Sequence, residues 1–360
     1  PLLENGNAVV DGGMAVRPWP HQLQVCERAC RDYPERWHML CDEVGLGKTI
    51  EAGLILRRLL LTQRVRRVLI LAPKHLVRQW QEELREKFNL WAYWYDGKSF
   101  VDPVGGVHEA PENPWDAEYS IIVASAHLAK RRGRMEVLLA AREWDLVLVD
   151  EAHHARRGWG PGSDNRPNRM LQLLDALRAR TRGMLLLTAT PMQIDVRELW
   201  DLLRIVGMDG RWAEGQGEAF RQYFHTLGHE QWEHEDLAFL LEMVCDYFAA
   251  GGEPDSSLAE RMKAEGEFVL WSQLTRATAP ADAARVAEAL RRSGLGSLVR
   301  RFLCTHTPVR QFVSRYTRET LRRYRAQGLF DANIATRCVE DRFIDLGPAR
   351  PLYDKIEEYI

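Results

Sequence analysis

The chain has 360 residues, of which 46% are hydrophobic and 28% charged, as in ordinary globular proteins. Its formal net charge of −2 excludes a globally basic protein, so a DNA-binding surface would have to be a local basic patch. No apolar run is long enough for a membrane span and no signal peptide is visible, so we expect no membrane partner. The six cysteines form no C-x-x-C pair, which favours a reduced, cytoplasmic setting. Because the first residue is Pro1 rather than Met, we expect a fragment of a longer protein.

Short apolar runs alternate with helical stretches between Trp37 and Val206. The predicted strands are 37–41, 67–72, 119–124, 145–150 and 183–188. The predicted helices are 20–33, 49–61, 75–88, 126–142, 169–180 and 195–206. Since the strand-like runs are apolar on both faces, the pattern predicts an α/β fold with a doubly wound parallel sheet. Ligands of such sheets bind at the carboxyl ends of the strands.

Strand-like runs stop near Gly207, and residues 211–300 are mostly helical in pattern, which predicts an appended α-helical insertion. An arginine-rich stretch follows, and a new helix begins near Leu352. We therefore divide the chain into 1–16 (leader), 17–206, 207–300, 301–345 (basic connector) and 346–360. The arginines from Arg300 to Arg325 have two open interpretations, a DNA-phosphate or lobe-interface contact and a solvated helix face.

A Gly-rich turn joins the first predicted strand to the helix that follows it. Its residues are Asp42, Glu43, Val44, Gly45, Leu46, Gly47, Lys48 and Thr49. Glycines let backbone N–H groups surround phosphate oxygens, and the helix amino end adds partial positive charge. Lys48 can reach the β- and γ-phosphates, and the Thr49 hydroxyl can hold Mg²⁺. The strict G-x-x-x-x-G-K-T pattern has Gly where this chain has Asp42, so the neighbouring motifs have to decide the interpretation.

A second motif is the acidic pair Asp150 and Glu151, which follows a buried strand. In a phosphate-loop enzyme the first acid holds the Mg²⁺ shell, and the second orients and deprotonates the attacking water. Polar residues of an ordinary turn are the alternative. We favour the enzyme because the pair lies about a hundred residues after the loop, on a strand that we expect to neighbour the loop strand.

Three further segments have weaker signals. Leu185–Gln193 is a buried strand that ends in Thr188, Thr190 and Gln193, which could hydrogen-bond with His153; a plain turn is the alternative. The stretch from Leu69 to Trp80 ends a strand at Pro73 and starts a helix flanked by Lys74 and His75, which suits a nucleic-acid phosphate; an ordinary α/β connection is the alternative. Gln22 precedes the first core strand and offers an amide donor and acceptor for an adenine edge.

Together and in this order, these segments resemble the superfamily-two helicases and, within them, the Swi/Snf-type ATPases. The matching segments are D-E-V-G-L-G-K-T-I-E-A-G, A-P-K-H-L-V-R-Q-W, S-I-I-V-A-S-A-H, D-E-A-H-H and L-T-A-T-P-M-Q. The resemblance covers about residues 17–206, with an echo at R-Y-T-R-E-T-L from Arg315 onward. Asp42 is expected in this branch of the family. The resemblance implies that 17–206 form a RecA-like phosphate-loop lobe.

The resemblance further implies an ATP-driven motor that moves along double-stranded DNA and uses ATP and Mg²⁺. Gln22 and the loop residues 42–49 would bind the nucleotide. Lys48, Asp150 and Glu151 would carry the chemistry, with Mg²⁺ on Thr49 and Asp150. His153, Thr188, Thr190 and Gln193 would couple nucleotide state to the grip on DNA. Pro73, Lys74, His75 and Ser125 would contact the DNA.

Motifs of the second RecA-like lobe have no match. The resemblance therefore implies that this lobe starts at 346–360 and that its motifs lie beyond Ile360, in the same chain. The lobe's arginine finger would be missing, so we expect this fragment alone to hydrolyse ATP poorly. The helical block 207–300 resembles bacterial members of the family more than eukaryotic remodellers. Bacterial members include the RNA-polymerase recycling ATPase and the motor of the DISARM anti-phage system, and the sequence from Arg315 to Ile360 favours the anti-phage type. That implies other defence-system proteins as partners.

Two alternatives to a double-stranded DNA translocase are a strand-separating helicase and a nucleotide-gated DNA-binding scaffold with a vestigial ATPase. The absence of a separation pin favours translocation over strand separation. The intact Lys48, Asp150 and Glu151 favour an active ATPase over a scaffold.

Overall fold

The computed structural model describes residues 14–158, 164–190, 196–276 and 296–328. The described residues up to Thr317 belong to one compact unit, and Arg318 begins a second unit. Most of the expected leader, the coupling residue Gln193 and the expected start of a second lobe (346–360) lie outside the described residues.

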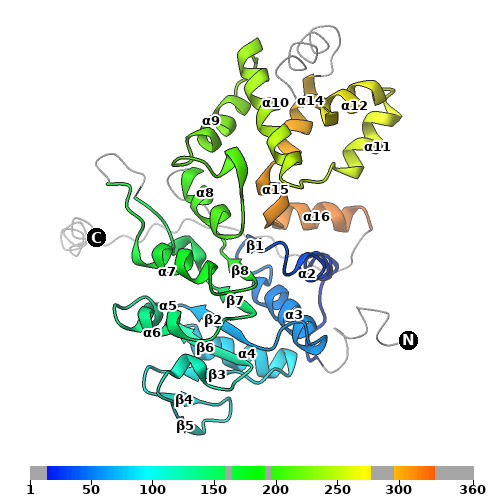
Figure 1. Cartoon of the computed structure of the whole chain (residues 1–360). Coiled ribbons are helices and arrows are strands. Elements are labelled where there is room, and N and C mark those ends of the chain that lie inside the picture. Colours follow the sequence, from blue (N-terminus) through cyan, green and yellow to red (C-terminus); the bar gives the residue numbers. More distant parts are fainter. Residues whose placement is uncertain (1–13, 159–163, 191–195, 277–295, 329–360) are drawn as a thin grey trace, which may run out of the picture. The chain divides into compact units, whose positions relative to one another are not determined.

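A single sheet of nine strands, counted over the described residues, organises the first unit (Figure 1). The spatial order is β5-β4-β3-β6-β2-β7-β8-β1-β9. The strands are β1 (His38–Leu40), β2 (Val68–Ala72), β3 (Tyr93–Tyr95), β4 (Ser99–Val101), β5 (Val107–Glu109), β6 (Ile121–Ser125), β7 (Leu146–Val149), β8 (Met184–Leu187) and β9 (Val313–Ser314). All pairings are parallel except those of β4 with β3 and β5. The predicted parallel core is therefore confirmed.

Helices cover both faces of this sheet, as the doubly wound prediction requires. On one face α2 (Pro20–Asp32), α3 (Lys48–Leu61) and α4 (Val77–Phe88) share a core with alternate residues of the strands. On the other face lie α5 (Ala126–Ala129), α6 (Arg134–Ala140), α7 (Arg169–Arg178) and α8 (Val196–Ile205). Within β2, Ile70 joins the first core while Leu69 and Leu71 join the second, because successive strand side chains point to opposite faces.

The order of the central strands corrects one expectation. The strand that ends at the acidic pair does not neighbour the loop strand, because β8 lies between β7 and β1. The crossover through α7 returns the chain to the side of β7 that faces β1, so β8 fills the position between them. The sequence pattern predicts each strand but not this order.

Two other differences have local causes. The predicted helix 126–142 is two helices, since Gly133 has a φ of +81° between α5 and α6. Strands β3 to β5 were not predicted, because each has three residues and none is the continuous buried run seen in β2 or β6. Strand β9 is shorter still and pairs with β1 from far along the chain.

The residues after α8 are helical, as predicted. They form η3 (Gly210–Trp212), α9 (Glu218–Leu227), α10 (His234–Ala249), α11 (Ser256–Ala264), α12 (Phe268–Arg276) and α14 (Gly296–Thr305). Their buried side chains, including Trp212, Tyr223 and Phe302, continue the core formed with α8. Figure 1 shows this helical block at the β1 end of the sheet, with β4 and β5 at the other end. The predicted boundary at residue 300 falls inside α14.

Two of the arginines between Arg300 and Arg325 make contacts within the helical block or with it. Arg300 donates to the carbonyl oxygens of Leu227 and Glu230, and its guanidinium lies 4.3 Å from the centroid of the Trp232 ring. Arg310 contacts Asp255 at 3.4 Å. The chain then passes through α15 (Pro308–Phe312) into β9, and α16 (Arg318–Ala326) belongs to the second unit. None of the helices in the described ranges is both long and apolar enough to cross a membrane.

Candidate nucleotide and nucleic-acid site

Apart from Gln22, which lies in α2, the predicted site segments of the described residues follow strands of the parallel core at the carboxyl edge of the sheet. Along that edge come Ser125 at the end of β6, Pro73–His75 after β2, Asp150–Glu151 after β7, Thr188–Thr190 after β8 and the loop 42–49 after β1. The predicted DNA contacts thus lie towards one end of the row and the phosphate loop towards the other. The acidic pair and the coupling residues lie between them.

The phosphate loop is shaped by two glycines with left-handed backbone. Gly45 and Gly47 have φ values of +84° and +92°, which residues with a Cβ rarely adopt. A Cβ on Gly47 would also lie 2.6 Å from the Gln22 Nε2 atom. Gly47 caps the 14-residue helix α3, and no side chain in the described part of the chain caps this helix end. The helix amino end therefore suits an anion such as a nucleotide phosphate.

Lys48 closes the loop from inside, because its Nζ atom donates to the Asp42 carbonyl oxygen at 2.8 Å. Burial raises the pKa of Asp150, and a hydrogen bond with His153 lowers that of Glu151; the charge of Lys48 is a smaller, lowering cause on both groups. The lysine and the acidic pair are thus brought together although β8 separates their strands. Within the loop Val44 is 58% exposed, whereas Leu46 is buried.

Gln22 is positioned by the loop rather than exposed for a ligand. Its Nε2 atom donates to the Leu46 carbonyl oxygen at 3.0 Å, and its Oε1 atom accepts from the Trp19 backbone N–H at 2.8 Å. The side chain is buried. Its role in adenine recognition stays a prediction, while its contact with the loop is a finding.

The acidic pair has two distinct environments. Burial raises the pKa of Asp150, whereas hydrogen bonding from His153 lowers the pKa of Glu151. The Glu151 N–H donates to Asp150 Oδ1 at 2.9 Å. Glu151 has a φ of +51°, a conformation that costs free energy for a non-glycine residue and is frequent at functional sites. Because its pKa is lowered, Glu151 is a carboxylate, the form that a general base needs.

Three predicted coupling residues meet next to the acidic pair. His153 Nδ1 lies 3.0 Å from Thr188 Oγ1 and 3.1 Å from Glu151 Oε2. The Thr190 N–H donates to Thr188 Oγ1 at 3.2 Å. A continuous set of polar contacts therefore joins the end of β8 to Glu151. Their role in coupling stays a prediction.

Asp42 behaves differently from its neighbours in the loop. Its carboxylate is fully buried, and its Oδ1 atom accepts from the Tyr316 N–H at 2.8 Å. His21 and Glu51 lie beside it, and these three side chains could each offer one ligand atom, within 4.8 Å of one another. Burial raises the pKa of Asp42 to about 6, raises that of Glu51 and lowers that of His21 to about 4. Burial thus favours the uncharged form of both carboxyl groups of this cluster, as it does for Asp150.

The predicted DNA contacts lie at the ends of two adjacent strands, β2 and β6. Ala72 and Ser125 are partners in the β2–β6 register, so the two strands end side by side and Lys74 follows two residues after Ala72. Lys74 and His75 are exposed, and helix α4 begins two residues later than predicted, at Val77. The Ser125 hydroxyl accepts from the His127 N–H at 3.2 Å and thus caps α5.

Sequence reasoning missed a basic group at the same edge. Arg131 and Arg132 are exposed in the turn that follows α5, beside the partly buried Lys130. The signal was present as the run K-R-R-G-R after the predicted strand 119–124. It lay inside a stretch that the pattern assigned to one long helix.

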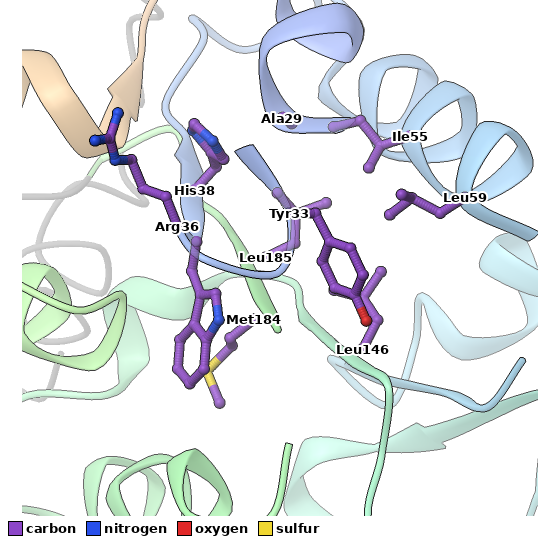
Figure 2. Close-up of a pocket in the computed structure, with 10 residues that line it drawn as sticks. Ala29, Tyr33, Arg36, His38, Ile55, Leu59, Leu146, Met184 and Leu185 are labelled. Carbon is purple, nitrogen blue, oxygen red and sulfur yellow. The ribbon is translucent and has the colours of Figure 1, made fainter. Parts of the chain in front are cut away.

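A small cavity at the other edge of the sheet is not part of this site. It measures about 20 Å³, and Figure 2 shows Tyr33 between Leu146 and Leu185 among its lining residues. His38, Leu146 and Met184 begin strands β1, β7 and β8, so the cavity lies at the amino ends of the strands. A volume of this size holds about one water molecule, which excludes a nucleotide.

The chain is similar to several known proteins. RNA polymerase-associated protein RapA from Vibrio cholerae serotype O1 (strain M66-2) is 39% identical over 197 residues, which cover 55% of this chain and 19% of that protein. RapA from Vibrio campbellii is 40% identical over 197 residues, which again cover 55% of this chain and 19% of that protein. The chain thus matches about a fifth of the length of these curated relatives. Among solved structures, the Sulfolobus solfataricus SWI2/SNF2 ATPase core in complex with dsDNA has a TM-score of 0.42 at 18% identity, over 54% of this chain and 36% of that chain.

The family model of the SNF2-related domain matches residues 21–248, which include the loop, the acidic pair, Thr188 and the first helices of the helical block. This match spans well over half of the chain. The chain therefore belongs to the SNF2-related domain family.

Proposed function

We propose that this chain is the first RecA-like lobe of a motor that hydrolyses ATP with Mg²⁺ and moves along double-stranded DNA. The observation that carries the proposal is the single sheet edge on which loop, acids and exposed basic residues follow one another. Lys48 and the α3 amino end would hold phosphates, with Thr49 and Asp150 as Mg²⁺ ligands. A bound Mg²⁺ would neutralise charge that develops on the phosphates.

Glu151 would then orient and deprotonate the attacking water, since its lowered pKa keeps it ionised. At the other end of the row, Pro73, Lys74, His75 and Ser125 would contact a DNA strand, and Arg131 and Arg132 extend the same basic surface. Phosphate contacts of this kind fix position without reading sequence, which suits a motor that moves along DNA. His153, Thr188, Thr190 and Gln193 would connect the two functions.

The decisive experiment measures ATP hydrolysis by the longer protein that carries a second lobe, with double-stranded, single-stranded or no DNA. We expect stimulation by double-stranded DNA. Stimulation by single strands alone would exclude the translocase and favour the strand-separating helicase. This chain alone should hydrolyse ATP at least about 10³-fold more slowly, because the arginine finger would come from the second lobe. Equal rates would contradict that part of the proposal.

A substitution separates the motor from the scaffold alternative. Glu151→Gln should abolish turnover while ATP and DNA still bind. Glu143→Gln is the matched control, since Glu143 is an exposed acid just before the amino end of the same strand, β7. This variant should hydrolyse ATP as the wild type does. If DNA-dependent function survives unchanged in Glu151→Gln, the scaffold alternative holds.

Two kinds of partner besides DNA are part of the proposal. The second RecA-like lobe is proposed to belong to the same protein. An anti-phage role with other defence proteins stays a prediction from the resemblance. The location in the cytoplasm is likewise a proposal.

A further inference from the structure

One peptide group of the phosphate loop is hydrogen-bonded on both sides. Its carbonyl oxygen, on Asp42, accepts from Lys48 Nζ at 2.8 Å. Its N–H, on Glu43, donates to the Tyr316 carbonyl oxygen at 3.0 Å. A rigid peptide plane thus connects the loop lysine with a residue 274 positions beyond Asp42 in the sequence.

The Asp42 side chain doubles this connection. Its Oδ1 atom accepts from the Tyr316 N–H at 2.8 Å, so both backbone polar groups of Tyr316 are held by residues 42 and 43. The Cys41 N–H donates to the Ser314 carbonyl oxygen at 2.8 Å, which continues the β1–β9 pairing into the loop.

Tyr316 also contacts the helix that carries Gln22. Its ring centroid lies 4.8 Å from that of His21, at the start of α2. Tyr316 is therefore in contact with both segments that are proposed to touch the nucleotide. Thr317 follows and ends the first compact unit, so this short segment is also the way out of that unit.

The lysine bond is the part of this arrangement that a nucleotide would alter. Phosphate oxygens would compete with the Asp42 carbonyl for the three N–H donors of Lys48, and charge-assisted bonds to phosphate are the stronger ones. A weaker or redirected Lys48 bond acts on the same peptide plane that holds Tyr316. The strict loop pattern has Gly at this position, and Gly would leave the Tyr316 N–H without this acceptor.

We propose that Asp42 is a positioning residue that transmits nucleotide occupancy of the loop to Tyr316 and to the segment leading out of the first unit. The inference rests on the proposed function in one respect, namely that the loop binds nucleotide. It assigns the Asp42 side chain a role towards the connecting segment, whereas sequence reasoning grouped Asp42 with the nucleotide ligands.

Hydrogen–deuterium exchange of this chain tests the inference. The exchange of a peptide that covers residues 313–317 is compared without nucleotide, with ADP and with a non-hydrolysable ATP analogue, all with Mg²⁺. Each variant is measured at a nucleotide concentration that saturates it in a fluorescence titration. In the wild type, we expect nucleotide to change the exchange rate of this segment at least about threefold. Asp42→Ala should reduce this response, because only the Glu43 N–H then holds Tyr316, and Asp42→Asn, which keeps a carbonyl acceptor, should retain it.

The outcomes separate the inference from the proposed function. A wild-type chain that binds no nucleotide overturns the proposed function and the inference together. A chain that binds nucleotide without any change in 313–317 overturns the inference alone, as does an unaltered response in Asp42→Ala. Circular dichroism and melting show whether each variant folds. If Asp42→Ala does not fold, Tyr316→Pro removes the same hydrogen bond from the other side and should reduce the response.

Discussion

The Trp80 indole N–H donates to Asp150 Oδ2 at 2.9 Å, so helix α4 holds the carboxylate that follows β7. Trp80 is 3% exposed and packs in the core beneath α4. Asp150 Oδ1 accepts from the Glu151 N–H, so both carboxylate oxygens have a fixed direction. No local pattern in the sequence indicates a role for a tryptophan at the site. The structure makes Trp80 a residue that orients the proposed Mg²⁺ ligand.

Replacing Trp80 by Phe removes this donor and keeps most of the buried ring. A hydrogen bond to a charged group contributes about 1.5–3 kcal/mol, so we expect about tenfold more Mg²⁺ to be needed for half-maximal nucleotide binding. The measurement is a titration of ADP binding at increasing Mg²⁺ concentrations.

Trp144→Phe is the matched control for that substitution. Trp144 is also fully buried, but its indole N–H has no hydrogen-bond partner among the described residues. This variant should therefore keep the wild-type Mg²⁺ dependence. Equal Mg²⁺ dependence in Trp80→Phe and Trp144→Phe would show that the Trp80–Asp150 bond does not position the metal ligand.

Thr188→Val tests the polar contacts beside the acidic pair. Valine keeps the shape of the side chain but removes the hydroxyl that contacts His153 and accepts from the Thr190 N–H. In the longer protein we expect stimulation of ATP hydrolysis by DNA to fall about tenfold while nucleotide still binds, as loss of about 1.4 kcal/mol of coupling would give. Thr181→Val, before the amino end of the same strand β8, should keep the stimulation. Full stimulation in Thr188→Val would contradict the coupling role.

Gly53→Ala tests the close approach of α3 and α4. A Cβ on Gly53 would lie 2.2 Å from Cε2 of Phe88, so one helix has to shift. Overpacking costs about 1–3 kcal/mol, which exceeds the gain of about 1 kcal/mol in helix propensity. Thermal unfolding should therefore show a lower melting temperature. The double variant Gly53→Ala with Phe88→Leu should recover part of the loss, and a single variant as stable as the wild type would refute this explanation.

His306 predicts a pH dependence of stability within the helical block. The ring is fully buried, its Nε2 atom accepts from the Asp255 N–H at 3.0 Å, and its Nδ1 atom lies 2.9 Å from the Phe302 carbonyl oxygen. The ring is therefore neutral, with the proton on Nδ1. Burial lowers its pKa, while the Phe302 carbonyl and Asp255 raise it and Arg310 lowers it further.

In the unfolded chain this histidine binds a proton below a pH of about 6.5, whereas in the folded chain its lowered pKa means that protonation requires a lower pH. The unfolded state thus binds more protons, and the free energy of unfolding falls as the pH drops below about 6.5, by up to about 1.4 kcal/mol per pH unit. His306→Gln should unfold with a smaller loss between pH 7.5 and pH 5.5 in denaturant titrations. His234→Gln, an exposed histidine at the start of α10, should keep the wild-type slope. Identical slopes in His306→Gln and the wild type would exclude this histidine as the cause.

The sequence alone predicted the parts of this protein that depend on neighbours along the chain. The strands β1, β2, β6, β7 and β8 are continuous apolar runs that hydrophobic periodicity reveals directly. The loop glycines and the acidic pair are local patterns whose residue types match a local chemistry. Since parallel strands bring their carboxyl ends to one edge, the sequence also predicted that these segments would gather there.

Only the tertiary structure decided the pairings between distant segments. It placed β8 between β7 and β1, added the two-residue strand β9 to the sheet and brought Trp80 to Asp150. It also turned the Asp42 carboxylate towards Tyr316, which no local pattern shows. Such contacts depend on how the whole sheet packs, because a buried hydrogen-bonding group takes whichever partner the fold brings to it.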